Sequence, residues 1–198
     1  MQPKNNNSLF AIAGMAGAAF FIFNLIIEYR YDLFPPGEGP LYVANQLGFF
    51  AGMIGLLIML VGLWRARAAG DGWFGRLALG LFIVAWTLLI LGGFISLFTG
   101  NADSFLQPLG GLGGLLGAVL TGIAVVLARR WTGWQRFAPL AQGLFMPAMM
   151  IIRGEFQPTF VIEVVWMGLW FLTSLALYTA RPQPATGLIP SEGEATAG

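Results

Sequence analysis

Charged residues are so sparse in this chain that they divide it into long uncharged segments, and this spacing constrains the fold more than any other feature. Five gaps between charged residues contain 23, 26, 26, 25 and 16 residues, and residues 156–180 contain only one charge, Glu163. Leu, Ile, Phe, Val, Ala and Gly dominate these segments. A helix of about 20 apolar residues crosses the roughly 30 Å hydrocarbon core of a bilayer. The sequence therefore predicts an all-α, polytopic integral membrane protein with a bundle of six transmembrane helices.

The predicted spans cover residues 8–27, 43–64, 77–98, 109–127, 137–152 and 159–180. The first is interpreted as a retained span because no small-residue cleavage site follows its apolar run. The spans make one transmembrane domain, residues 1–180. Residues 181–198 are rich in Pro, Gly, Ser, Thr and Ala, a composition that predicts a disordered cytoplasmic tail.

Basic residues are distributed unequally between the two sides of this six-span arrangement. One side receives eight Lys and Arg residues and the other receives only two, so the positive-inside rule places the side with eight in the cytoplasm. Both termini are then cytoplasmic, and we expect the chain in a bacterial plasma membrane. The cytoplasmic bases are Lys4, Arg65, Arg67, Arg76, Arg129, Arg130, Arg136 and Arg181, and the outer ones are Arg30 and Arg153.

Composition also removes several classes of chemistry. The chain of 198 residues has no cysteine and no histidine, so thiolate catalysis, imidazole metal ligation and a His-activated nucleophile are all absent. Its net charge of +1 and its lack of a long basic run argue against nucleic acid as a partner. We therefore expect no cofactor and no metal site. Any catalysis would rest on carboxylates alone, which disfavours an enzyme.

Polar residues near the outer ends of the spans form the main candidate site. Glu163 is the only charge well inside a predicted span, and intramembrane carboxylates usually face the bundle interior with a partner. Arg153 is a candidate counter-ion for Glu163 or Glu28. A structural salt bridge at the helix ends is the alternative explanation. The predicted ligand-binding residues are Glu163, Glu28, Asn24, Asn45, Gln46, Arg153, Trp166 and Trp170.

Two further features concern the helices themselves. The fifth span is short and contains Pro147, which predicts a kinked helix and is compatible with either a binding site or ordinary packing. Glycines at four-residue spacing allow close helix packing, either within the chain or with a second copy or a partner subunit. These glycines are Gly48, Gly52, Gly110, Gly113, Gly114 and Gly117.

Three functions remain open from the sequence. The first is transport or binding of a small solute, ion or lipid through the outer polar pocket. The second is a non-catalytic accessory or scaffold subunit of a membrane complex, which fits the short loops. The third is a membrane enzyme acting on lipid-like substrates.

Overall fold

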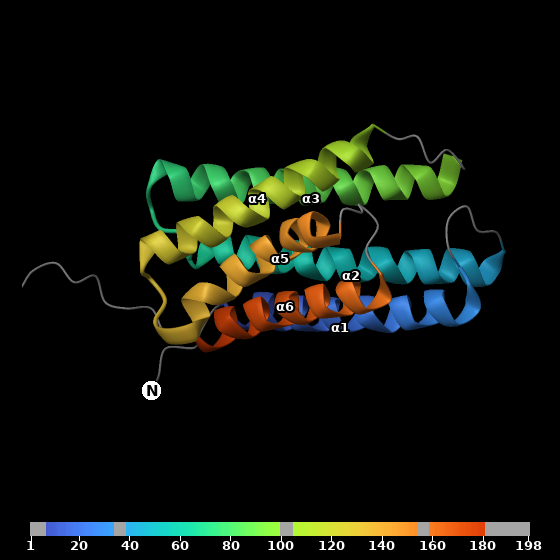
Figure 1. Cartoon of the computed structure of the whole chain (residues 1–198), viewed down its shortest axis with the longest axis horizontal. Coiled ribbons are helices and arrows are strands. Elements are labelled where there is room, and N and C mark those ends of the chain that lie inside the picture. Colours follow the sequence, from blue (N-terminus) through green and yellow to red (C-terminus); the bar gives the residue numbers. More distant parts are fainter. Residues whose placement is uncertain (1–6, 34–38, 100–104, 154–158, 181–198) are drawn as a thin grey trace, which may run out of the picture.

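The computed structural model describes residues 7–33, 39–99, 105–153 and 159–180, which fold into six α-helices and one 3-10 helix without a strand. The prediction of an all-α protein is confirmed. In Figure 1, α1, α2 and α3 run side by side along the long axis, while α4 and α5 cross obliquely. The elements are α1 (Ser8–Tyr31), α2 (Pro40–Arg65), α3 (Trp73–Thr99), α4 (Leu106–Ala128), η1 (Gly133–Phe137), α5 (Ala138–Arg153) and α6 (Phe160–Thr179).

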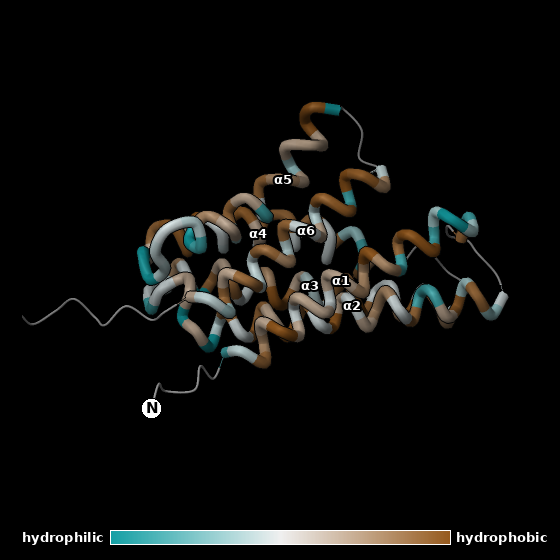
Figure 2. Tube along the Cα trace, turned by 90° about the horizontal axis from the view of Figure 1, so that it is seen from below, coloured by the Kyte–Doolittle hydropathy of each residue, from teal (hydrophilic) through white to brown (hydrophobic). Residues whose placement is uncertain are grey.

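Five of these helices, all except α5, are long and apolar enough to cross a membrane. Large apolar side chains are exposed along them, and Figure 2 shows that hydrophilic positions gather mainly toward the helix ends. The apolar helices indicate an integral membrane protein. The predicted fifth span corresponds to α5, which has 16 residues and contains Pro147, so the count of six spans is not confirmed by helix length. The predicted tail, residues 181–198, lies outside the described residues.

Several helices extend beyond the spans that were predicted from charge spacing. The helix α1 continues past residue 27 to Tyr31, where Asp32 adopts a left-handed conformation (φ 53°) and ends it. The amide of Leu33 donates to the carbonyl of Glu28 at 3.0 Å, a bond that closes the last turn. The charged residue Glu28, which ends the predicted span, therefore lies inside the helix, and the backbone hydrogen bonds continue for about another turn.

Glycines bring α1 and α2 into close antiparallel contact. A Cβ added to Gly17 would come within 2.7 Å of the Gly52 carbonyl oxygen, and one added to Gly55 within 2.8 Å of the Gly17 Cα. Nearer the other end of the pair, a Cβ at Gly48 would collide with the amide of Asn24. Backbones this close favour dispersion contacts, which replace the hydrophobic drive that is missing in lipid.

Close packing at glycines also joins α3, α4 and α5. A Cβ on Gly110 would come within 2.5 Å of the Leu89 nitrogen, and one on Gly117 within 2.7 Å of the Phe82 Cα. A Cβ added to Gly143 of α5 would lie 2.5 Å from the Ala118 carbonyl oxygen. Most of the glycines singled out in the sequence thus pack within the chain. A homodimer or a partner subunit on these faces stays a prediction.

An aromatic cluster fills the centre of the bundle. The Trp170 side chain is fully buried, with its ring centroid 4.8 Å from Trp86 and 5.5 Å from Phe82. Trp86 Nε1 donates a hydrogen bond of 3.1 Å to the Met53 carbonyl of α2, and Trp166 lies 6.2 Å from Trp86. The cluster therefore ties α6 to α3 and, through Trp86, to α2.

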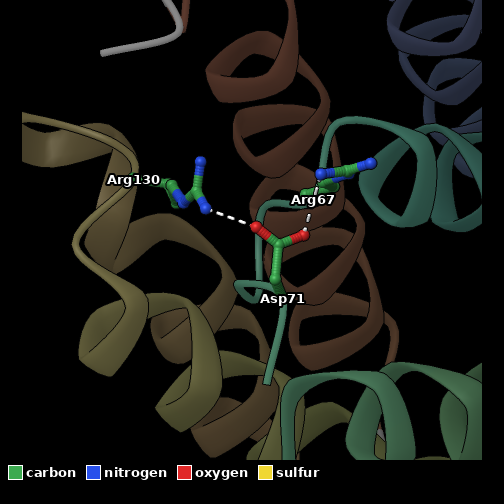
Figure 3. A network of polar contacts seen from close by, with 3 residues as sticks. All are labelled: Arg67, Asp71 and Arg130. Atoms are coloured by element: carbon green, nitrogen blue, oxygen red, sulfur yellow. Dashed lines mark hydrogen bonds and ion pairs between the residues drawn. The ribbon is translucent and has the colours of Figure 1, made fainter. Parts of the chain in front are cut away.

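The two predicted cytoplasmic loops meet at one end of the bundle. Asp71, in the connection between α2 and α3, pairs with Arg67 at 3.2 Å and also accepts a hydrogen bond from Arg130, which follows α4. Figure 3 shows the carboxylate between the two guanidinium groups. These groups are partly exposed, so the pairs position the loops more than they stabilise the fold. The start of α1 and the end of α6 lie at this same end (Figure 1).

Candidate outer polar site

The antiparallel register of α1 and α2 brings Glu28 level with Asn45. Asn24 packs against Gly48, and Glu28 is one helical turn beyond Asn24 on the same face of α1. Asn45 lies about one turn before Gly48 on α2, toward the same end of the bundle as Glu28. The four positions therefore face one another at the end of the bundle opposite the Arg-rich loops.

Three of these side chains are almost fully removed from solvent. The exposed fractions are 3% for Asn24, 8% for Glu28 and 3% for Asn45. Asn24 Nδ2 donates a 2.7 Å hydrogen bond to the Phe20 carbonyl. Neither Nδ2 nor Oδ1 of Asn45 has a hydrogen-bond partner among the described residues. An unpaired buried amide is costly, so Asn45 lowers the stability of the bundle where no water completes its hydrogen bonds.

Glu163 approaches the same region from α6. It lies in the first turn of that helix, where the helix dipole favours a negative charge, and it is partly buried and within electrostatic range of Glu28. Tyr29 and Phe160 join the two helices beside it, with ring centroids 5.0 Å apart. The predicted convergence of Glu28 and Glu163 is therefore seen in the structure.

No ion pair between Arg153 and Glu28 or Glu163 is found in the described part of the chain, and the counter-ion role of Arg153 stays a prediction. Among the described residues the ion pairs join only Asp71 to Arg67 and Arg130. The end of α5, where Arg153 lies, stands away from the other helices in Figure 2. The two neighbouring carboxylates, Glu28 and Glu163, thus lie at the same end of the bundle, and neither has an ion pair within the described part of the chain.

A cavity of about 320 Å³ opens beside Glu28, between α2, α3 and α4. Glu28 supplies its only charge, and Gln46, Tyr42, Ser96 and Gln107 supply further polar groups. The predicted residues Glu28 and Gln46 thus line a real cavity, whereas Asn24, Asn45 and Glu163 lie outside its lining. Sequence reasoning missed the contributions of α3 and α4. The apolar lining comes from Phe49, Phe50, Met53, Leu89, Gly93 and Leu97.

Trp166 and Trp170, also predicted as ligand contacts, are placed elsewhere. Trp170 belongs to the central aromatic cluster and does not line the outer cavity. Trp166 lines a second cavity of about 500 Å³ between α3, α4, α5 and α6, which shares Leu89 and Gln107 with the first. Gln142 of α5 lines this second cavity. A polar residue within a short apolar span was therefore the signal in the sequence that could have indicated it.

No cluster of three or more His, Asp or Glu side chains that could hold a metal ion is found in the described part of the chain. Protein-family models, curated proteins and solved structures were each compared with the chain, and none matches it. The site itself is therefore the basis for assigning a function.

Proposed function

We propose that this chain is a six-span membrane protein of the bacterial plasma membrane that binds a small organic cation from the outer side. In this proposal both termini lie in the cytoplasm. The excess of basic residues at one end of the bundle supports that orientation, because cytoplasmic loops retain Lys and Arg.

The path of the chain supports α5 as the sixth crossing. The helix α4 ends at the Arg-rich end of the bundle, and α6 begins toward the opposite end (Figure 1). Residues 129–159 must therefore cover that distance, and α5 is the helix within them. At about 1.5 Å per residue α5 spans about 24 Å, which requires a locally thinned bilayer or contacts with neighbouring helices.

The observation that carries the proposed ligand class is the lining of the outer cavity, where one carboxylate faces aromatic rings. Glu28 is the one charged residue in this lining, and no ion pair of Glu28 is found in the described part of the chain. Tyr42, Phe49 and Phe50 supply aromatic rings, whose faces attract an alkylammonium group through cation–π contact. A volume of about 320 Å³ far exceeds a bare metal ion and suits an organic cation. Glu163 adds negative potential nearby.

The test uses two probes of nearly equal shape. Benzyltrimethylammonium is a cation, and neopentylbenzene replaces its nitrogen by carbon and is neutral. With the cation at about 100 times its dissociation constant, binding stabilises the protein by about 2.7 kcal/mol, or roughly 5–10 °C in melting temperature for a domain of this size. The neutral probe should give a much smaller shift.

Glu28→Gln tests the assigned residue in the same assay. The variant keeps the size and the hydrogen-bonding ability of the side chain, and it should lose most of the shift produced by the cation. Equal shifts with the charged and the neutral probe, or an unchanged response in Glu28→Gln, would reject the proposal.

A further inference from the structure

A cavity of about 500 Å³ lies between α3, α4, α5 and α6, and the proposed cation site does not use it. Its walls are almost entirely apolar. One wall is the backbone of Gly111 and Gly114 on α4, and aromatic rings of Trp86, Phe82 and Trp166 form part of the others. Glycine backbone and flat aromatic rings in one lining leave room for a flat apolar molecule.

Two of the three α4 glycines that line the cavity, Gly111 and Gly114, differ from the third, Gly110. A Cβ added to Gly111 or Gly114 would find no atom within 4 Å, whereas one added to Gly110 would collide with the backbone of α3. Gly110 is thus required for helix contact. Gly111 and Gly114 border open space, and filling that space with a side chain leaves the helix packing intact.

Two amide side chains, Gln107 and Gln142, line this otherwise apolar cavity, and Gln142 is the one with an unpartnered buried nitrogen. Its side chain lines the cavity and is 3% exposed, and its Nε2 is buried without a hydrogen-bond partner among the described residues. The terminal amide torsion of Gln is soft, so a small rotation turns Nε2 toward the cavity. An acceptor oxygen on a bound molecule would complete its hydrogen bonding.

The depth of Gln142 distinguishes between possible acceptors. The next residue, Gly143, packs against the carbonyl of Ala118, close to the middle of α4 and about 15 Å from its nearer end. Phospholipid ester groups lie at the boundary of the roughly 30 Å hydrocarbon core. An ester carbonyl is therefore too far out, and an acceptor at this depth must belong to a molecule that enters the membrane interior.

We propose that this cavity binds a neutral, flat, apolar molecule with a ring carbonyl, of the quinone type, whose oxygen accepts a hydrogen bond from Gln142. Glycine backbone and tryptophan rings enclose its ring. This site adjoins the proposed cation site, with which it shares Leu89 and Gln107, but does not depend on cation binding there.

The test measures quenching of tryptophan fluorescence in the purified full chain by decylubiquinone, because a quinone in the cavity contacts Trp86 and Trp166. We expect saturable quenching. Gly114→Leu should abolish the saturable component by filling the cavity. The matched control is Gly168→Leu on α6, where an added Cβ also meets no atom within 4 Å but which does not line the cavity. This control should retain saturable quenching.

Gln142→Leu tests the contribution of the hydrogen bond, whereas Gly114→Leu tests the effect of filling the cavity. It should weaken decylubiquinone binding by about tenfold, the effect of losing about one hydrogen bond, while raising the melting temperature of the ligand-free protein because an unpaired amide is removed. Decylbenzene, which lacks the oxygens, should compete weakly. Non-saturable quenching that is equal in all variants, or equal competition by decylbenzene, would overturn the proposal. Glu28→Gln should leave this quenching unchanged, so the two proposals fail independently.

Discussion

Adding one methyl group at neighbouring positions of α4 should have opposite effects on stability. Gly110 and Gly114 lie one turn apart on the same helix, and Gly→Ala favours the helix by up to about 1 kcal/mol at either position. A Cβ at position 110 would lie 2.5 Å from the Leu89 nitrogen and 2.8 Å from the Ala85 carbonyl oxygen. These are backbone atoms, so α3 and α4 must separate by roughly 1 Å to reach ordinary contact. Overpacking of this kind costs about 1–3 kcal/mol.

Gly110→Ala should therefore be destabilised by up to about 2 kcal/mol after the helical gain is subtracted. Gly114→Ala, whose Cβ meets nothing within 4 Å, should be neutral or up to about 1 kcal/mol more stable. At about 2–4 °C per kcal/mol, thermal unfolding in detergent resolves this difference. Equal melting temperatures for the two variants would refute the close approach of α3 and α4 at Gly110.

Three further outcomes follow from the structure. Asn45→Leu should raise stability by about 1–3 kcal/mol in the absence of ligand because both polar atoms of the Asn45 side chain are unpaired. Asn24→Leu should lower stability because the Asn24 side chain already has a hydrogen-bond partner and packs on Gly48. Thermal unfolding of the two variants checks both outcomes. Since the chain has no cysteine, Thr132→Cys and Leu41→Cys can each be labelled alone in intact cells with a membrane-impermeant maleimide. Only Leu41→Cys should react, and the reverse pattern would invert the proposed orientation. Arg129→Gly should raise the stability of the protein by about 1 kcal/mol, because φ is 51° at this position and glycine adopts that conformation without strain. Thermal unfolding measures the change. A loss of stability would show that the contacts of the arginine side chain outweigh the backbone strain.

The helices could be predicted from the sequence because lipid demands long apolar runs, and charge spacing located every one of them. The same signal misjudged their ends: hydrogen bonding carries α1 through Glu28 to Tyr31, a segment that charge alone assigns to a loop. Polar residues within apolar segments also singled out Glu28 and Gln46, which line one cavity, and Glu163, which lies within electrostatic range of Glu28.

The other residues of the site depend on which helices pack together, and the spacing of charged and polar residues along the chain does not show this. Gln107 and Ser96 join Glu28 only because α3 and α4 pack beside α2. Trp170 shares a stripe of α6 with Glu163, yet its distance from the helix start places it in the central cluster. The two roles of Gly110 and Gly114, packing and cavity wall, are likewise indistinguishable by spacing.

The most direct test of the proposed function is the affinity of benzyltrimethylammonium, measured by isothermal titration calorimetry with the wild type, Glu28→Gln and Glu163→Gln. A carboxylate at the cavity wall should contribute about 2 kcal/mol, or about 30-fold in dissociation constant. Glu163 lies outside the lining, and its loss should weaken binding by only a few-fold. Equal affinities for the wild type and Glu28→Gln would contradict the proposal that Glu28 forms the cation site.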